Sequence, residues 1–223
     1  MPTRRNFLKN ISGALAFVAL SGETLALATR FVSHKVAYAT KGVLSVIRSL
    51  QAEGSNVVLK MMNGNKYKRN PLVHYPFDGG ILDEETGYRV FFHAHREKEY
   101  GHFHTFYEKP NGDLVHLIMV SMDKKGYPIQ LSTVNRWVTG DVFVKADELK
   151  EYFLKFKMND SLFSDKRIGV FVRELFTEYK TEILGLIAER DNTIRGYVKK
   201  NAREPFGDRE VEILSSTKIE IKT

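Results

Sequence analysis

Histidines are concentrated in one short stretch of this chain, where two pairs have the spacing His-x-His. The pairs are His93 with His95 and His102 with His104, and Glu99 lies between them. On a β-strand, residues two positions apart point to the same face of the sheet. If a hairpin pairs His95 with His102, it also pairs His93 with His104, and all four imidazoles then share one face.

Four neutral imidazoles on one small patch are natural ligands for a divalent transition metal, with Zn, Cu, Fe and Mn as the candidate ions. Glu99 would complete a mixed shell of histidine and carboxylate ligands, and a shell with an open position suits redox chemistry or hydrolysis. The alternative is that the histidines form the polar face of a half-buried hairpin, each with a local hydrogen bond. Two pairs so close together favour the metal site.

A second group of candidates, for ligand binding, follows the last strand of the expected meander. Asn135, Arg136 and Trp137 supply an amide, a guanidinium and an indole, which could bind a carboxylate or phosphate and stack a ring. The alternative is a structural turn with Trp137 in the core. His74 lies in a preceding loop and is a candidate cap over the histidine site.

Three residues are candidates for catalytic roles. Asp123 and Arg96 could hold imidazoles in one tautomer, and Asp123 could equally act as a general base. Arg136 is the third candidate, as a contact to a substrate anion. His34 and His116 are expected to be ordinary histidines.

The first residues resemble a twin-arginine signal peptide, because Arg4 and Arg5 precede the sequence Asn-Phe-Leu-Lys and an uncharged apolar stretch over 11–20. That stretch is too short for a stable anchor. Small residues at Ala26 and Ala28 predict cleavage after position 28. The pattern predicts export to the periplasm by the twin-arginine translocase, with no stable membrane span after cleavage; a leader retained as an anchor is the alternative. Such leaders belong to proteins exported already folded, often with a cofactor.

Composition excludes several classes of function. The 223 residues include no cysteine, which rules out disulfides, thiolate metal sites and a cysteine nucleophile. The formal net charge of +7 is spread without a long run of Lys or Arg, so a nucleic-acid partner is not expected. The phosphate-loop, Gly-x-Ser-x-Gly and His-Glu-x-x-His motifs are missing. A small-molecule ligand is the partner that remains.

The elements that hold these residues are predicted to form one α+β domain over residues 29–223, behind a leader over 1–28. The domain is an antiparallel β meander of about five to seven strands, packed with an N-terminal helix and two C-terminal helices. Helices are expected at 31–52, 146–156 and 168–199. Strands are expected at 57–62, 88–96, 102–108, 114–122, 129–134, 210–214 and 218–221, with a long ordered loop over 66–87.

Two resemblances bear on these expectations. The spacing of Gly87, His93, His95 and Glu99 resembles the first metal motif of the cupin superfamily. The second cupin motif is not matched at its required interval, so this likeness concerns the type of ligand and not the fold.

The second resemblance rests on motifs along nearly the whole mature chain: His-Tyr-Pro at 74–76, His-Ala-His-Arg at 93–96, Gly-His-Phe-His-Thr-Phe at 101–106 and Asn-Arg-Trp-Val-Thr-Gly at 135–140. Together they resemble an uncharacterised bacterial domain family, which has no established activity. The resemblance implies that these segments belong to one domain. The function expected from the residues is a periplasmic metal-binding protein or a small, oxidoreductase-like metalloenzyme; the alternative is a non-enzymatic ligand-binding or protein-interaction domain.

Overall fold

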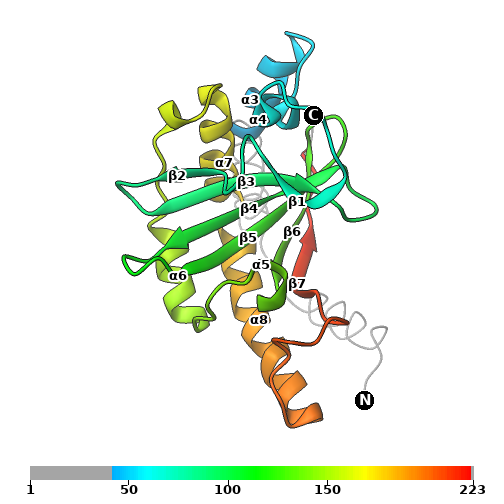
Figure 1. Cartoon of the computed structure of the whole chain (residues 1–223), viewed down its shortest axis with the longest axis vertical. Coiled ribbons are helices and arrows are strands. Elements are labelled where there is room, and N and C mark those ends of the chain that lie inside the picture. Colours follow the sequence, from blue (N-terminus) through cyan, green and yellow to red (C-terminus); the bar gives the residue numbers. More distant parts are fainter. Residues whose placement is uncertain (1–41, 222–223) are drawn as a thin grey trace, which may run out of the picture. The chain divides into compact units, whose positions relative to one another are not determined.

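The structure is a computed structural model that describes residues 42–221, and these form an antiparallel sheet with helices packed against it (Figure 1). The predicted leader, His34 and the first part of the helix expected at 31–52 lie outside the described residues. The predicted α+β class is confirmed. Within 42–221, no helix is both long and apolar enough to cross a membrane.

The sheet has seven strands, and the four in its middle follow one another along the chain as a meander. All of the pairings are antiparallel, as the short connecting turns predict. The spatial order is β1 (Asn70–Tyr75), β3 (Tyr88–Ala94), β4 (Gly101–Glu108), β5 (Leu114–Met122), β6 (Pro128–Val134) and β7 (Ile213–Lys218), and β2 (Ile81–Asp83) also pairs with β3.

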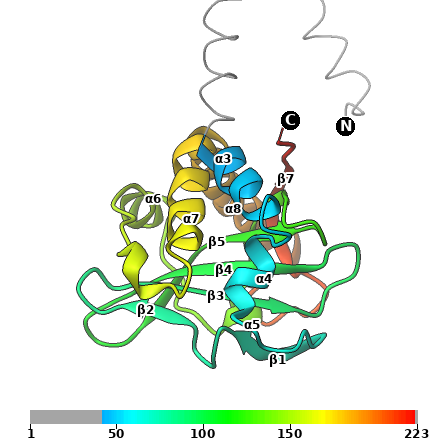
Figure 2. The same cartoon turned by 90° about the horizontal axis from the view of Figure 1, so that it is seen from above.

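Most of the helices lie on one face of this sheet. Figure 2 shows α3, α6, α7 and α8 on that face, and α5 near β1 on the other side. The long helix expected at 168–199 is two helices, because the chain turns at Tyr179. The α-helices are α3 (Gly42–Gln51), α4 (Val57–Met62), α5 (Arg136–Thr139), α6 (Ala146–Leu154), α7 (Lys166–Glu178) and α8 (Lys180–Asn201), with a short 3-10 helix at Asp160–Leu162.

The prediction of a strand at 57–62 is wrong, because this segment forms α4. The Asn56 side chain accepts a hydrogen bond from the Leu59 amide and caps the start of the helix. Asn63 ends it in the left-handed conformation with φ of 50°. A segment of six residues, five of them apolar, fits a strand and a buried helical turn equally well, so the two asparagines decide between them.

Two further expectations are corrected at the edges of the sheet. The segment 66–87, expected as a loop, contains β1 and β2, whose pairing with β3 is short or irregular. The two strands expected at 210–214 and 218–221 are the single strand β7, which pairs with β6 from Val134 opposite Ile213 to Gln130 opposite Lys218. Short edge strands carry little alternation in their sequence, so the sequence pattern does not distinguish them from loops.

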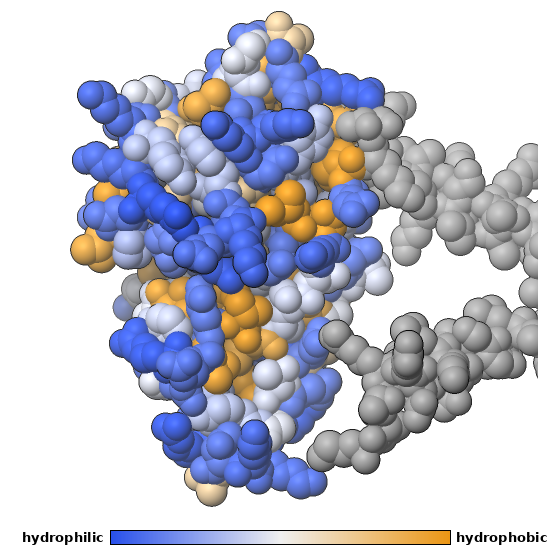
Figure 3. Space-filling model, turned by 90° about the vertical axis from the view of Figure 1, so that its right-hand side faces the viewer, coloured by the Kyte–Doolittle hydropathy of each residue, from blue (hydrophilic) through white to orange (hydrophobic). Residues whose placement is uncertain are grey.

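Side-chain alternation on β3 and β4 sets the two faces of the sheet. Phe92 pairs with Phe103, and the Phe103 ring lies 6.1 Å from the ring of Phe171 in α7, so these side chains belong to the helix-covered core. Their neighbours His93 and His102, which follow Phe92 and precede Phe103, therefore point to the opposite face. On the surface, Figure 3 shows apolar patches lying among hydrophilic residues on one side of the molecule.

Candidate metal centre

The observed hairpin pairs His93 with His102 and Phe91 with His104, two residues away from the register predicted with His93 opposite His104. The prediction was wrong because β3 ends at Ala94, so His95 lies in the loop and not on the strand. A shift of two residues preserves the face of every side chain. His93, His102 and His104 therefore still lie on one side of the sheet, and the ring of His95 contacts those of His93 and His102 from the loop.

Three of these histidines come together closely. The ring centroids of His93 and His102 are 4.4 Å apart, and that of His95 lies 4.8 Å from His93 and 5.1 Å from His102. One ligand atom from each ring lies within 4.8 Å of the others. This histidine triad, His93, His95 and His102, could hold a metal ion.

Hydrogen bonds fix the tautomers of the two buried members of the triad. The Glu99 carboxylate accepts a hydrogen bond from Nδ1 of His102. The Pro71 carbonyl oxygen accepts one from Nδ1 of His93 at 3.2 Å. A neutral imidazole has a single N–H, and neither acceptor can donate in return. Both Nε2 atoms therefore carry lone pairs.

These two Nε2 atoms lie 2.6 Å apart. Two lone pairs at that distance repel each other unless a cation lies against both, and the cation is either a proton or a metal ion. Histidines that bind metals characteristically donate their other ring N–H to a carboxylate or a backbone carbonyl, as His102 and His93 do here. The donor set therefore fits a metal ion.

Burial keeps His93 and His95 in the form that binds metals. It lowers the pKa of His93 to about 2, with the nearby His102 adding to the effect. The same causes, burial first, lower the pKa of His95 to about 4. Neutral imidazole is the ligand form, and protonation competes with metal binding.

Glu99 lies behind His102 and does not line the face that His93 and His95 present. Burial raises the pKa of its carboxyl, but the hydrogen bond from His102 and the nearby Arg96 lower that pKa below its usual value on balance. Arg96 Nη1 lies 3.8 Å from Glu99 Oε2, and Arg96 Nε lies 3.1 Å from Glu212 Oε1. Arg96 thus neutralises the carboxylate that orients His102.

His104 lies next to the triad and pairs with a histidine that we expected to be ordinary. Its ring centroid is 5.0 Å from that of His93 and 4.8 Å from that of His102. Its Nδ1 lies 2.8 Å from Nε2 of His116, and its buried Nε2 has no hydrogen-bond partner among the described residues. A bulge between β4 and β5 brings His116 to this face, and a bulge has no clear sequence signal.

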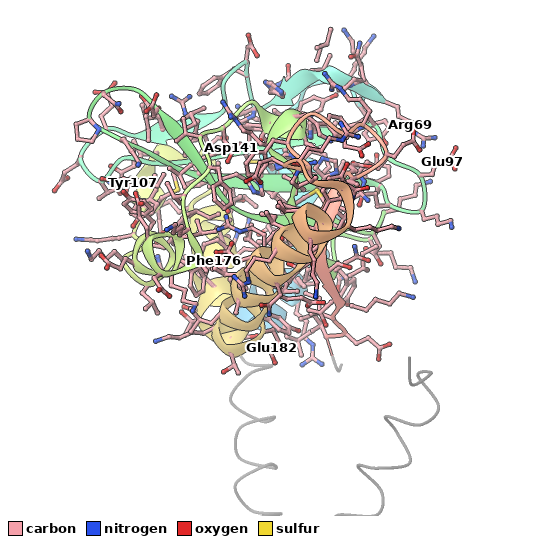
Figure 4. The ribbon with its side chains drawn as sticks, turned by 90° about the horizontal axis from the view of Figure 1, so that it is seen from below. Arg69, Glu97, Tyr107, Asp141, Phe176 and Glu182 are labelled. Atoms are coloured by element: carbon pink, nitrogen blue, oxygen red, sulfur yellow. The ribbon has the colours of Figure 1, made fainter. Side chains whose placement is uncertain are left out.

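The triad faces a cavity of about 710 Å³. His93, His95 and His104 line it, and His102 does not. The cavity runs along β3 and its following loop from Arg89 to His95, between the two ends of the hairpin that carry Tyr107 and Glu97, which Figure 4 shows at opposite margins of the molecule. The predicted capping residue His74 also lines it. The sequence did not identify the rest of its wall, which comes from β1, β3, β4, α5 and the segment before β7: Leu72, Phe91, Phe106, Val138, Arg209 and Glu212.

The predicted ligand-binding trio is divided between different roles. Asn135 is fully buried and donates to the carbonyl oxygens of Pro205 and Val211, both at 2.8 Å. Trp137 lines the cavity, and its Nε1 donates to the Val211 carbonyl oxygen at 2.9 Å. Arg136 does not line the cavity; its Nε donates to the Asp141 carbonyl oxygen.

Asp123, a candidate base, lies in the turn between β5 and β6. Its Oδ1 accepts hydrogen bonds from the backbone amides of Lys125 and Tyr127, each at 2.8 Å. This is the pattern of a side chain that stabilises a turn.

No curated protein and no solved structure matches the chain significantly. A family model does match, over residues 37–219, and its description is a domain of unknown function, DUF6969. The resemblance inferred from the motifs is thereby confirmed. The chain belongs to this family.

Proposed function

We propose that this protein binds a divalent first-row transition metal ion through His93, His95 and His102 and presents it to a small molecule in the adjoining cavity. The observation that carries the proposal is the pair of Nε2 lone pairs directed at each other across 2.6 Å, with both Nδ1 atoms committed to hydrogen bonds. The third imidazole favours a metal ion over a shared proton, since a proton needs only two acceptors.

The donor set narrows the identity of the ion. Three imidazoles without a thiolate suit Zn or Cu better than the harder ions, and three histidines with an open fourth position form a known type of catalytic zinc shell. The open position would face the cavity that His93 and His95 line. Zinc would act there as a Lewis acid and lower the pKa of a bound water. We therefore propose Zn first, with Cu, Fe and Mn as the competitors in the test.

We also propose that the protein works in the periplasm, because its first residues match the twin-arginine leader pattern. Export of the folded chain would allow the ion to be bound before translocation. The test is cell fractionation of the full chain and of Arg4→Lys/Arg5→Lys. The variant should accumulate uncleaved in the cytoplasm; equal amounts of both chains in the periplasm would contradict this route.

The metal proposal is tested by loading purified full chain with Zn, Cu, Fe or Mn salts, removing excess ion and measuring bound metal by mass spectrometry. His95→Ala is the informative variant, because this side chain is only half-buried and lies outside β3. We expect one ion per wild-type chain and an affinity at least about 100-fold lower in the variant, more than the loss from a missing supporting residue.

His74→Ala is the matched control. Its ring lies 5.5 Å from that of His93 and lines the same cavity, but it is outside the triad. It should retain the ion. Stoichiometric metal in His95→Ala would disprove the triad, and no metal in the wild type would leave a shared proton between His93 and His102. Circular dichroism of each variant checks that the fold persists.

A further inference from the structure

The cavity beside the triad has the size and lining of a site for a small organic molecule. Its volume of about 710 Å³ lies within the range of ligand pockets, which are mostly apolar with a few polar groups. The rings of Phe91 and Phe106 stack with centroids 5.5 Å apart on its wall. Trp137 and Leu72 extend this apolar surface. A molecule held here would present a flat, apolar part to these rings.

The charged residues of the cavity indicate which charge the rest of the bound small molecule would carry. Glu212 is paired with Arg96 at 3.1 Å, and Asp78 with Nδ1 of His74 at 3.0 Å. Arg89 is bound to Glu108 and to the Gly79 carbonyl oxygen. Glu212 and Arg89 are therefore balanced by charged partners within the chain, and Asp78 accepts a hydrogen bond from His74.

Arg209 differs from the other charged residues of the cavity wall. Its guanidinium carbon lies 4.7 Å from the centroid of the Trp137 ring, and it forms no ion pair or hydrogen bond with any residue in 42–221. Stacking on an indole holds the guanidinium in place and leaves its N–H groups available. A guanidinium of this kind favours a carboxylate, which it can bind with two parallel hydrogen bonds.

We infer that the cavity binds an aromatic carboxylate. Its ring would lie against Phe91 and Phe106, its carboxylate would bind Arg209, and any further substituent would point toward the triad. This inference rests on the proposed function for what happens at the triad, since it names the class of molecule that the metal ion meets. Binding of the molecule itself needs only the aromatic wall and the arginine.

The test measures binding of 3-phenylpropionate and of its uncharged amide by equilibrium dialysis against metal-free protein. Trp137 is the one tryptophan of the chain, so quenching of its fluorescence reports binding in this cavity. For the carboxylate we expect about tenfold tighter binding than for the amide, because charge-assisted hydrogen bonds are the strong ones. In Arg209→Gln that preference should disappear. Arg203→Gln removes the same charge from an exposed side chain outside the cavity and should keep the preference.

The outcomes separate this inference from the proposed metal site. Carboxylate binding that persists in metal-free protein supports the inference even if no ion is ever bound. Metal binding without any binding of 3-phenylpropionate overturns it and leaves the metal site standing. Equal affinities for the carboxylate and the amide in the wild type would overturn the role of Arg209. A preference that appears only after Zn is added would place the carboxylate on the ion and not on the arginine.

Discussion

Nδ1 of His104 and Nε2 of His116 lie 2.8 Å apart, on adjacent strands, and both side chains are buried. Only one proton can lie between the two nitrogens, and a second would bring two positive charges together in the interior. Burial lowers the pKa of His116 to about 3, with the nearby Arg190 and His102 adding to the effect. Burial, followed by the neighbouring histidines, holds the pKa of His104 well below its usual value.

These pKa values predict that the metal-free protein loses stability as the pH falls below 6.5. Between pH 6.5 and 3 the unfolded chain binds a proton at His116 that the folded chain does not, so acid favours unfolding. At pH 5 the contribution of this one residue is about 2 kcal/mol. Urea denaturation at pH 7.5 and 5 measures the change. In His116→Gln, unfolding should take up about one proton fewer, so the free energy of unfolding should change less between the two pH values. An unchanged pH dependence would show that His116 is not held neutral.

Substitution of Glu99 should weaken metal binding without removing a proposed ligand. Its carboxylate accepts the hydrogen bond from Nδ1 of His102, which raises the basicity of the imidazole. We expect Glu99→Gln to lower zinc affinity by about 10- to 100-fold, the usual effect of losing such a partner. Competition with a chromophoric chelator measures the affinity. Glu97→Gln, in the same loop but exposed, is the control and should bind zinc as the wild type does.

Gly101 should tolerate no side chain, because it begins β4 directly against β3. A Cβ added there would lie 2.7 Å from the His93 carbonyl oxygen and closer still to the Phe92 ring. We expect Gly101→Ala to lower the free energy of unfolding by about 1–3 kcal/mol, the usual cost of overpacking a core.

Gly185 is the matched control for this substitution. It lies within α8, and a Cβ there meets no atom within 4 Å. Gly185→Ala should raise the free energy of unfolding by about 0.5–1 kcal/mol, because alanine loses less conformational freedom in a helix. Urea denaturation of both variants gives the comparison. Equal effects of the two substitutions would contradict the close approach of β3 to Gly101.

Asn135 should prove structural, because its buried side chain connects the end of β6 to the segment before β7. Loss of its amide removes the hydrogen bonds to the carbonyl oxygens of Pro205 and Val211 and the one that its Oδ1 accepts from the Arg136 amide. We expect Asn135→Ala to lower the free energy of unfolding by about 2–3 kcal/mol, since each such hydrogen bond contributes about 0.5–1.5 kcal/mol. Binding of 3-phenylpropionate should also weaken, because Arg209 lies in the segment that Asn135 holds. A variant as stable as the wild type would contradict this role.

The hairpin shows which features of the site could be predicted from the sequence alone. The His-x-His spacing predicted that the four imidazoles share one face. The structure agrees for His93, His102 and His104 because strand alternation depends only on residue parity, whereas His95 joins them from the loop. The register was missed by two residues, since nothing local marks where the ladder stops beside a loop with Lys98 at φ of 66°. His116 and Arg209 reach the site through a bulge and a distant segment, which no periodicity encodes.

The triad comes from a stretch of ten residues, His93 to His102, so a metal ion can bind all three imidazoles before the rest of the sheet exists. The unfolded chain then also has some affinity for the ion, and this residual affinity reduces the stabilisation that binding gives the native state. Zinc should therefore raise the melting temperature by less than its affinity for the native site alone implies. The ion would act partly as a template that closes the hairpin early, and it would influence the rate of folding as well as the final stability.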